Sequence, residues 1–144
     1  MLYYLDTMIV IYAVEGNAAS QQRALAHLSA LEQAGHRFAI SDLTRTECLV
    51  PVLGPGGGQR LSDFFRFFRG PNLRTLQPTA AMYTRASAIR SGHTYPAAPP
   101  VPPRRYGLAD ALHLAAAVEF GCDVFLTNDD QSADFTDITV EVLP

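Results

Sequence analysis

Four carboxylates occupy positions where an α/β protein could carry out chemistry. Asp6 directly follows a short apolar run near the start of the chain, and Asp129 follows another near its end. If these runs are parallel strands, both acids lie at the carboxyl edge of the sheet, where ligand crevices form. Glu47 and Asp110 stand among apolar residues in stretches of helical character, and acids in such places are rarely left buried without a partner.

Converging carboxylates repel one another unless they share a cation. Oxygen-only ligands select a hard divalent ion, so Mg²⁺ is the first candidate and Mn²⁺ is the alternative. Such an ion bridges carboxylates to phosphates and lowers the pKa of a bound water, which is the chemistry of phosphodiester hydrolysis. The other interpretation is that each acid is a helix cap or a solvated side chain, because spacing along the chain does not show that the four meet.

The types of basic residue in the chain exclude several classes of enzyme. All eleven are arginine, and the chain has no lysine. This composition excludes a P-loop nucleotide site, a pyridoxal Schiff base, and the active-site lysine of haloacid-dehalogenase phosphatases and response-regulator receivers. The formal net charge of −3 provides no general basic surface, so any contact with nucleic acid must be local.

Short apolar runs alternate along the chain with stretches of helical periodicity. The expected strands are 2–5, 38–40, 73–76, 123–126 and 138–143. The expected helices are 8–14, a stretch through 24–31 that ends at Gly35, 42–50, 61–68, 79–89 and 107–120. This alternation favours one α/β domain over residues 1–144, with a parallel sheet covered on both faces. Residues 92–106 contain five prolines and are expected to form an extended surface loop.

The chain has no sequence signal for a membrane. Its longest apolar runs are much shorter than a membrane span, and its first ten residues lack the basic start of a signal peptide. We therefore expect a soluble, cytoplasmic protein without membrane contact. The two cysteines, Cys48 and Cys122, form no metal-binding or disulfide pattern.

The segments around the four acids resemble, in order, the acidic motifs of PIN domains, and more closely those of VapC toxins from bacterial toxin–antitoxin pairs. These segments are Leu5–Thr7, Thr44–Glu47, Leu108–Ala117 and Leu126–Asp129. The resemblance implies a three-layer α/β/α sandwich around a central, mostly parallel sheet. It also implies a metal-dependent endoribonuclease that cleaves single-stranded RNA, the toxin of a type II pair, held in check by a cognate antitoxin protein.

The same resemblance implies roles for the four acids. By position, Asp6, Glu47 and Asp110 would form the metal site, and Asp129 would bind the metal directly or through water. The chain departs from the family pattern at Met8, where members usually have a small hydroxyl residue. It departs again in the proline-rich segment before the last helix. Neither departure removes an acid.

Four further residues are candidates for substrate binding. Thr127 and Asn128 would orient their loop by side-chain hydrogen bonds. Arg104 and Arg105 form, with the tyrosine that follows them, a compact basic and aromatic group just before the last helix. This group could bind the RNA backbone beside the metal, and a solvated arginine pair is the equal alternative.

Two other features bear on the site and on partners. His113 lies one turn after Asp110 on the same helical face, and we expect it to pack or to form hydrogen bonds instead of binding the metal. The aromatic helix at 61–68 has more apolar residues than one face can bury. We therefore expect an exposed patch for a second copy of the chain, as in a homodimer, or for an antitoxin helix.

Two other functions stay open. The chain could be a PIN-like scaffold that mainly binds a partner protein, although a scaffold has no need of mutually repelling carboxylates. It could also be another Mg²⁺-dependent phosphohydrolase or a DNA nuclease built on a similar sheet. A gene for a small DNA-binding protein immediately upstream would favour the toxin over both.

Overall fold

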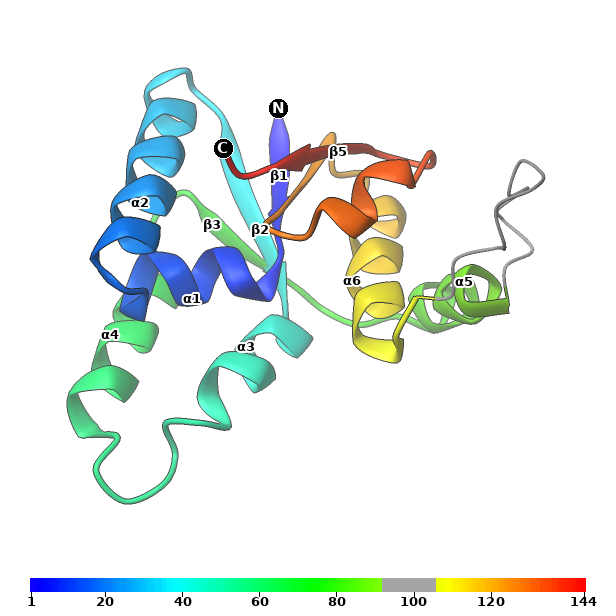
Figure 1. Cartoon of the computed structure of the whole chain (residues 1–144). Helices are drawn as coiled ribbons and strands as arrows, with labels where there is room; N and C mark the ends of the chain where they lie inside the picture. Colours follow the sequence, from blue (N-terminus) through cyan, green and yellow to red (C-terminus); the bar gives the residue numbers. More distant parts are fainter. Residues whose placement is uncertain (92–105) are drawn as a thin grey trace.

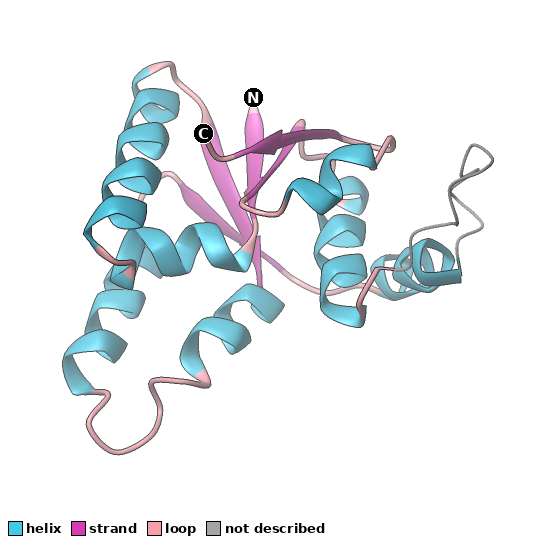
Figure 2. Cartoon of the chain, in the orientation of Figure 1, coloured by secondary structure: helices cyan, strands magenta, loops and turns pink. Residues whose placement is uncertain are grey.

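A five-stranded parallel sheet forms the centre of the protein in the computed structural model, which describes residues 1–91 and 106–144 (Figures 1 and 2). The strands lie in the order β3-β2-β1-β4-β5, and every neighbouring pair is parallel. Their bounds are β1 Leu2–Leu5, β2 Arg37–Ser41, β3 Leu73–Leu76, β4 Val124–Thr127 and β5 Thr139–Val142. A parallel sheet must be covered on both faces, because its strands are apolar on both.

Helices supply that cover on each side of the sheet (Figure 1). One face carries α1 Thr7–Glu15, α2 Ala18–Gln33 and α4 Gly58–Phe68, and the other carries α5 Ala80–Ser91 and α6 Leu108–Glu119. A further helix, α3 Asp42–Leu49, follows β2 directly. Side chains along β1 point alternately to the two faces of the sheet, so Tyr3 and Leu5 pack in one hydrophobic core and Tyr4 packs in the other. The predicted three-layer α/β/α sandwich is confirmed.

The strand order decides where a site can form. The chain builds β1, β2 and β3 outward in one direction, and then returns to place β4 on the other side of β1. The direction of winding therefore reverses between β1 and β4, and in open α/β sheets ligands bind beyond the carboxyl ends of the strands at such a point. Asp6 follows β1 and Asp129 lies two residues beyond β4, so the fold brings two predicted acids to this crevice.

Most expected elements are present, with differences at their ends. The helix that the sequence predicts around 24–31 begins earlier, at Ala18, because Asn17 caps it by accepting a hydrogen bond from the Ser20 backbone N–H. Leu25 of this helix is 47% exposed. The expected exit loop after β4 continues into a short 3₁₀ helix, η1 Asp130–Asp134, which Asp129 caps through the Gln131 N–H.

The proline-rich loop predicted at 92–106 lies outside the described residues except for Tyr106, which is buried. Within the described part of the chain, every helix is too short or too polar to cross a membrane.

Candidate active site

Asp6 occupies the junction between the central strand and the first helix. Its backbone is extended, its N–H donates to Leu126 O of β4 at 2.9 Å, and its Oδ1 accepts from the Thr7 N–H at 2.7 Å. The carboxylate thus caps α1, as a residue between an apolar strand and an apolar helix is suited to do. Its other oxygen, Oδ2, accepts from the Thr127 hydroxyl at 2.7 Å, which ties the end of β1 to the end of β4.

The structure brings all four predicted acids to one pocket of about 320 Å³. Asp6 lies at the end of β1, Glu47 on α3, Asp110 in the first turn of α6 and Asp129 after β4. The remaining lining residues are Thr7, Met8, Ile11, His113, Phe125 and Ser132. Sequence spacing gave no reason to include Ile11 or Ser132, although Met8 and Ile11 lie one helical turn apart on α1 and so share a face.

The four acids differ in how deeply they lie. Asp6 and Glu47 are half-buried, whereas Asp110 and Asp129 are exposed. Burial raises the pKa of Asp6 above that of an ordinary aspartate, and the nearby His113 and the hydrogen bond from Thr127 oppose that shift only in part. The pocket therefore has an inner pair of fixed acids and an outer pair at the solvent edge.

Glu47 is held by two donors. Its Oε2 accepts from Nε2 of His113 at 2.8 Å and from the Thr7 hydroxyl at 2.5 Å. The hydrogen bond from His113 is the main reason that the pKa of Glu47 lies below its ordinary value, and the bond from Thr7 adds to the effect against the opposing effect of burial. The expectation that His113 forms hydrogen bonds is confirmed, while the part played by Thr7 was missed.

The loop after β4 is organised by side-chain hydrogen bonds. Thr127 is 1% exposed, and besides donating to Asp6 its Oγ1 accepts from the backbone N–H of Asp129 at 3.0 Å. Asn128 is half-buried, and its Nδ2 donates to the Tyr12 hydroxyl at 3.2 Å. Both side chains are thus engaged within the protein, and Thr127 connects two of the acids directly.

The donor set suits a hard divalent cation by its chemistry, because four carboxylates supply only oxygen. In the arrangement observed, no three His, Cys, Asp or Glu side chains of residues 1–91 and 106–144 are grouped closely enough to hold a metal ion together. Asp110 and Asp129 are the exposed members, and Asp129 also accepts a hydrogen bond from the Gln131 N–H through its Oδ1. A shared cation therefore requires the acids at the solvent edge to move closer to Asp6 and Glu47.

The other two candidate substrate-binding residues, Arg104 and Arg105, lie outside the described residues. Leu108, which follows them at the start of α6, is exposed. A local source of positive charge beside this acidic pocket therefore stays a prediction from the sequence.

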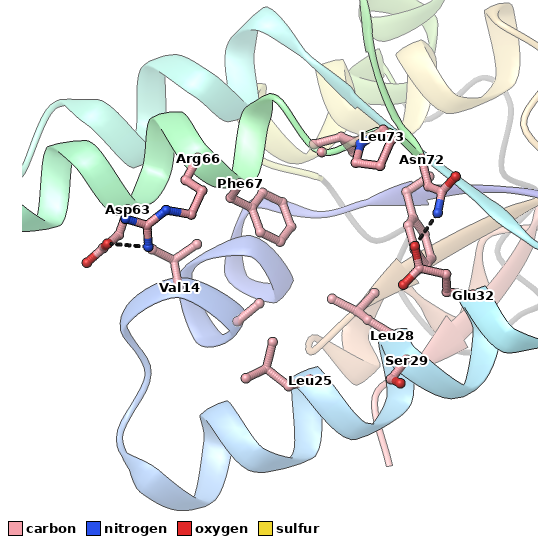
Figure 3. Close-up of a pocket in the computed structure, with 14 residues that line it drawn as sticks. Val14, Leu25, Leu28, Ser29, Glu32, Asp63, Arg66, Phe67, Asn72 and Leu73 are labelled. Atoms are coloured by element: carbon pink, nitrogen blue, oxygen red, sulfur yellow. Dashed lines mark hydrogen bonds and ion pairs between the residues drawn. The ribbon is translucent and has the colours of Figure 1, made fainter.

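A separate apolar groove of about 460 Å³ lies between α1, α2 and α4 (Figure 3). Its apolar lining includes Val14, Leu25, Leu28, Phe67 and Leu73. Polar pairs bound it at both ends, where Arg66 contacts Asp63 at 3.2 Å and the Asn72 amide donates to Glu32. The predicted aromatic helix thus buries Phe64 and Phe68 in the core and turns Phe67 toward this groove.

A comparison with family models identifies one family. The PIN domain model matches residues 3–138, which is nearly the whole chain. A search of curated protein sequences gives no significant match.

Solved structures with the same fold come from toxin–antitoxin systems. VapBC2 from Rickettsia felis, bound to a DNA fragment from their promoter, has a chain with 19% identity and a TM-score of 0.79 over 100% of both chains. DNA-bound VapBC from Salmonella typhimurium gives 18% identity and a TM-score of 0.74, again over 100% of both chains. VapC20 from Mycobacterium tuberculosis, a sarcin–ricin loop cleaving toxin, gives 14% identity and a TM-score of 0.65 over 94% of this chain and 98% of that chain.

Proposed function

This chain belongs to the PIN-domain family, and from that membership we propose that it is a metal-dependent endoribonuclease that cleaves single-stranded RNA, the toxin of a type II toxin–antitoxin pair. The observation that carries the proposal is the meeting of four carboxylates from four separate segments in one pocket. A scaffold protein has no use for such a cluster, because like charges brought together cost free energy.

Within this proposal the acids hold Mg²⁺, with Mn²⁺ as the alternative. Asp6, Glu47 and Asp110 are the direct ligands, and Asp129 binds directly or through a water. When bound, the cation supplies a water of lowered pKa and neutralises charge that develops on the phosphate. The chain's own contribution is positional, since Thr127 fixes Asp6 and the Asp129 loop while His113 and Thr7 fix Glu47.

RNA is the proposed substrate on two grounds. VapC20, which shares the fold, is a sarcin–ricin loop cleaving toxin and therefore acts on RNA. This chain also carries the pair Arg104 and Arg105 just before the Asp110 helix, which is a local source of positive charge in a protein of net charge −3. We assign these two arginines to the phosphate backbone of the substrate. Thr127 and Asn128 act on the substrate indirectly, by orienting the loop that carries Asp129.

The groove between α1, α2 and α4 is the proposed antitoxin site. Two of the solved relatives are VapBC complexes, in which a toxin and an antitoxin are crystallised together. A groove with an apolar floor and polar pairs at its ends fits an amphipathic helix of such a partner. We also propose that the protein forms a homodimer and lies in the cytoplasm. A second copy of the chain is the alternative occupant of the groove, and binding experiments distinguish it from an antitoxin.

Cleavage assays test the function directly. The protein is incubated with tRNA, rRNA, mRNA and a single-stranded DNA in the presence of Mg²⁺, Mn²⁺ or EDTA, beside the Asp110→Asn variant. The proposal requires RNA cleavage with either metal, and none with EDTA or with the variant. Cleavage of DNA in place of RNA would identify a DNA nuclease, and cleavage of neither would leave the scaffold as the function.

A further inference from the structure

A buried chain of polar side chains runs from the sheet to the acidic pocket. The Tyr4 hydroxyl lies 2.8 Å from the Ser41 hydroxyl and 2.8 Å from Nδ1 of His113, within hydrogen-bond distance of both. Nε2 of the same ring lies 2.8 Å from Oε2 of Glu47. Tyr4 is 0% exposed, and Ser41 and His113 are each 2% exposed. Hydrogen bonds among buried groups are costly to break, because water cannot replace the lost partner.

The chain connects elements that are distant in sequence. Tyr4 lies on β1, Ser41 at the end of β2, His113 on α6 and Glu47 on α3. Each bond therefore fixes one element relative to another at the carboxyl edge of the sheet. Because the imidazole is buried between two partners, its ring orientation is set from the Tyr4 side and its proton donor is directed at Glu47.

These hydrogen bonds also engage both ring nitrogens of His113, so neither is available to bind a metal. One ring nitrogen faces Tyr4 and the other faces Glu47, so the imidazole would have to break a buried bond to bind a metal itself. A carboxylate only accepts, and thus Nε2 carries the proton in the bond to Glu47. The bond from Thr7 goes to this same oxygen, Oε2, so in the described part of the chain Oε1 is the oxygen of Glu47 that remains for a ligand.

We propose that His113, itself held by Tyr4, is a positioning residue that orients Glu47 for the divalent cation without contacting that cation. This inference rests on the proposed function, because it concerns the same site. Groups that hold a metal-ligating side chain by hydrogen bonds typically account for about 10–100-fold in metal affinity. A loss of that size is therefore expected when the donor to Glu47 is removed and the fold is kept.

Two amide substitutions distinguish the effect of losing the hydrogen-bond donor to Glu47 from the effect of losing the packing of the imidazole ring. In His113→Gln the amide nitrogen reaches the place of Nε2 and can still donate to Glu47. In His113→Asn the amide is one carbon shorter, so it can meet Tyr4 but not Glu47. We expect His113→Gln to bind Mn²⁺ within about threefold of the wild type and His113→Asn to bind about 10–100-fold more weakly. Affinity is measured on the whole protein by electron paramagnetic resonance of free Mn²⁺, and folding is checked by thermal melting.

Tyr4→Phe supplies a second variant, in case His113→Asn does not fold. It removes only the hydroxyl, so we expect a several-fold loss of Mn²⁺ affinity in the wild-type background. The loss should disappear when Tyr4→Phe is combined with His113→Gln, because Tyr4 acts through the imidazole ring and the two effects are then not additive. His36→Leu is the matched control, since His36 precedes β2 at the opposite edge of the sheet, and its Mn²⁺ affinity should equal that of the wild type.

The outcomes distinguish this inference from the proposed function. Wild-type affinity for Mn²⁺ in every folded variant of His113 and Tyr4 would overturn the positioning role and leave the metal site intact. Absence of Mn²⁺ binding by the wild type itself, matched by Asp110→Asn, would instead remove the proposed function together with this inference. Equal losses of Mn²⁺ affinity in His113→Gln and His113→Asn would show that the ring serves packing, and would also overturn the positioning role of His113.

Discussion

The hydroxyl of Thr127 donates to Oδ2 of Asp6 over 2.7 Å, although 121 residues separate the two along the chain. The same hydroxyl accepts from the backbone N–H of Asp129 at 3.0 Å. One buried side chain at the end of β4 thus fixes the acid that ends β1 and the loop that carries another acid. Thr127, a polar residue at the end of an apolar strand, therefore helps to assemble the pocket.

Thr127→Val tests that relationship with little change in volume. The substitution leaves Oδ2 of Asp6 and the Asp129 N–H without their partner, and we expect a loss of about 1–3 kcal/mol in the free energy of unfolding together with weaker Mg²⁺ binding. Thr127→Ser keeps the hydroxyl and should retain most of both. Chemical denaturation and metal titration measure the two quantities, and equal behaviour of the Val and Ser variants would show that the hydroxyl is dispensable.

Mg²⁺ should stabilise the wild-type protein. A ligand that binds only the folded state at 100 times its Kd adds about 2.7 kcal/mol, which raises the melting temperature by several degrees in a domain of this size. Asp110→Asn should melt as a folded protein but lose this increase. Asp130→Asn is the matched control, because Asp130 lies beside Asp129 without lining the pocket, and it should keep the increase. No shift in the wild type at millimolar Mg²⁺ would contradict the metal site.

The inner acids should affect stability in opposite directions as pH changes. Burial raises the pKa of Asp6, so the charged carboxylate destabilises the folded protein and the protonated form is relatively favourable. This relative gain in stability is complete below the unfolded pKa of about 3.9, and it is lost as pH rises through the folded pKa. The bond from His113 lowers the pKa of Glu47, so its charged form adds stability that is present above about 4.3 and is lost as pH falls through the folded pKa.

The corresponding amides make this measurable. With EDTA at pH 7, we expect Asp6→Asn to be more stable than the wild type and Glu47→Gln to be less stable by about 1 kcal/mol. Both differences should shrink when pH is lowered toward 4 and below, since the wild-type carboxyls then become neutral as well. Denaturation curves at several pH values give the comparison, and two differences of the same sign at pH 7 would refute it.

Leu25→Arg should weaken the proposed antitoxin complex while leaving the acidic pocket unchanged. Leu25 is 47% exposed and lines the apolar groove, so an arginine there is tolerated by the fold but introduces charge where a partner helix would bury apolar surface. Leu53→Arg is the control, because Leu53 is 66% exposed and lies outside the groove. Co-purification with the proposed antitoxin measures the difference, and equal retention by both variants would place the partner elsewhere.

Replacing both Arg104 and Arg105 by alanine should weaken RNA binding and reduce its dependence on salt. Each lost phosphate contact lowers the slope of log affinity against log salt by about 0.7 for a single strand, so two lost contacts lower it by about 1.4. Mn²⁺ affinity should not change, because no proposed ligand is altered. A double variant of Arg23 and Arg37 removes the same charge elsewhere, and a slope equal to that of this control would show that the pair does not bind RNA.

Local features of the sequence were sufficient to predict the elements and the chemical type of the site. Short segments of three to six residues, rich in apolar side chains, predicted the strands, because burial on both faces of a parallel sheet requires such segments. The place of Asp6 between an apolar strand and an apolar helix is typical of a helix cap, which is the role it has in the fold. The choice of four acids depended on residue type and on resemblance to an ordered set of motifs, and each of the four lines the same pocket.

The tertiary structure decided which of these residues meet. The placement of β4 beside β1 depends on contacts across more than a hundred residues, which no local periodicity encodes, and it brings Thr127 to Asp6. The link from Tyr4 through His113 to Glu47 joins β1, α6 and α3, and the local sequence around each of the three residues does not show that they meet. The sequence therefore determined the helices, the strands and the presence of four carboxylates, since these follow from short-range preferences and side-chain chemistry. Packing of the helices on the sheet determined the pairing of those carboxylates with their hydrogen-bond donors, because only the folded chain brings these side chains within hydrogen-bond distance.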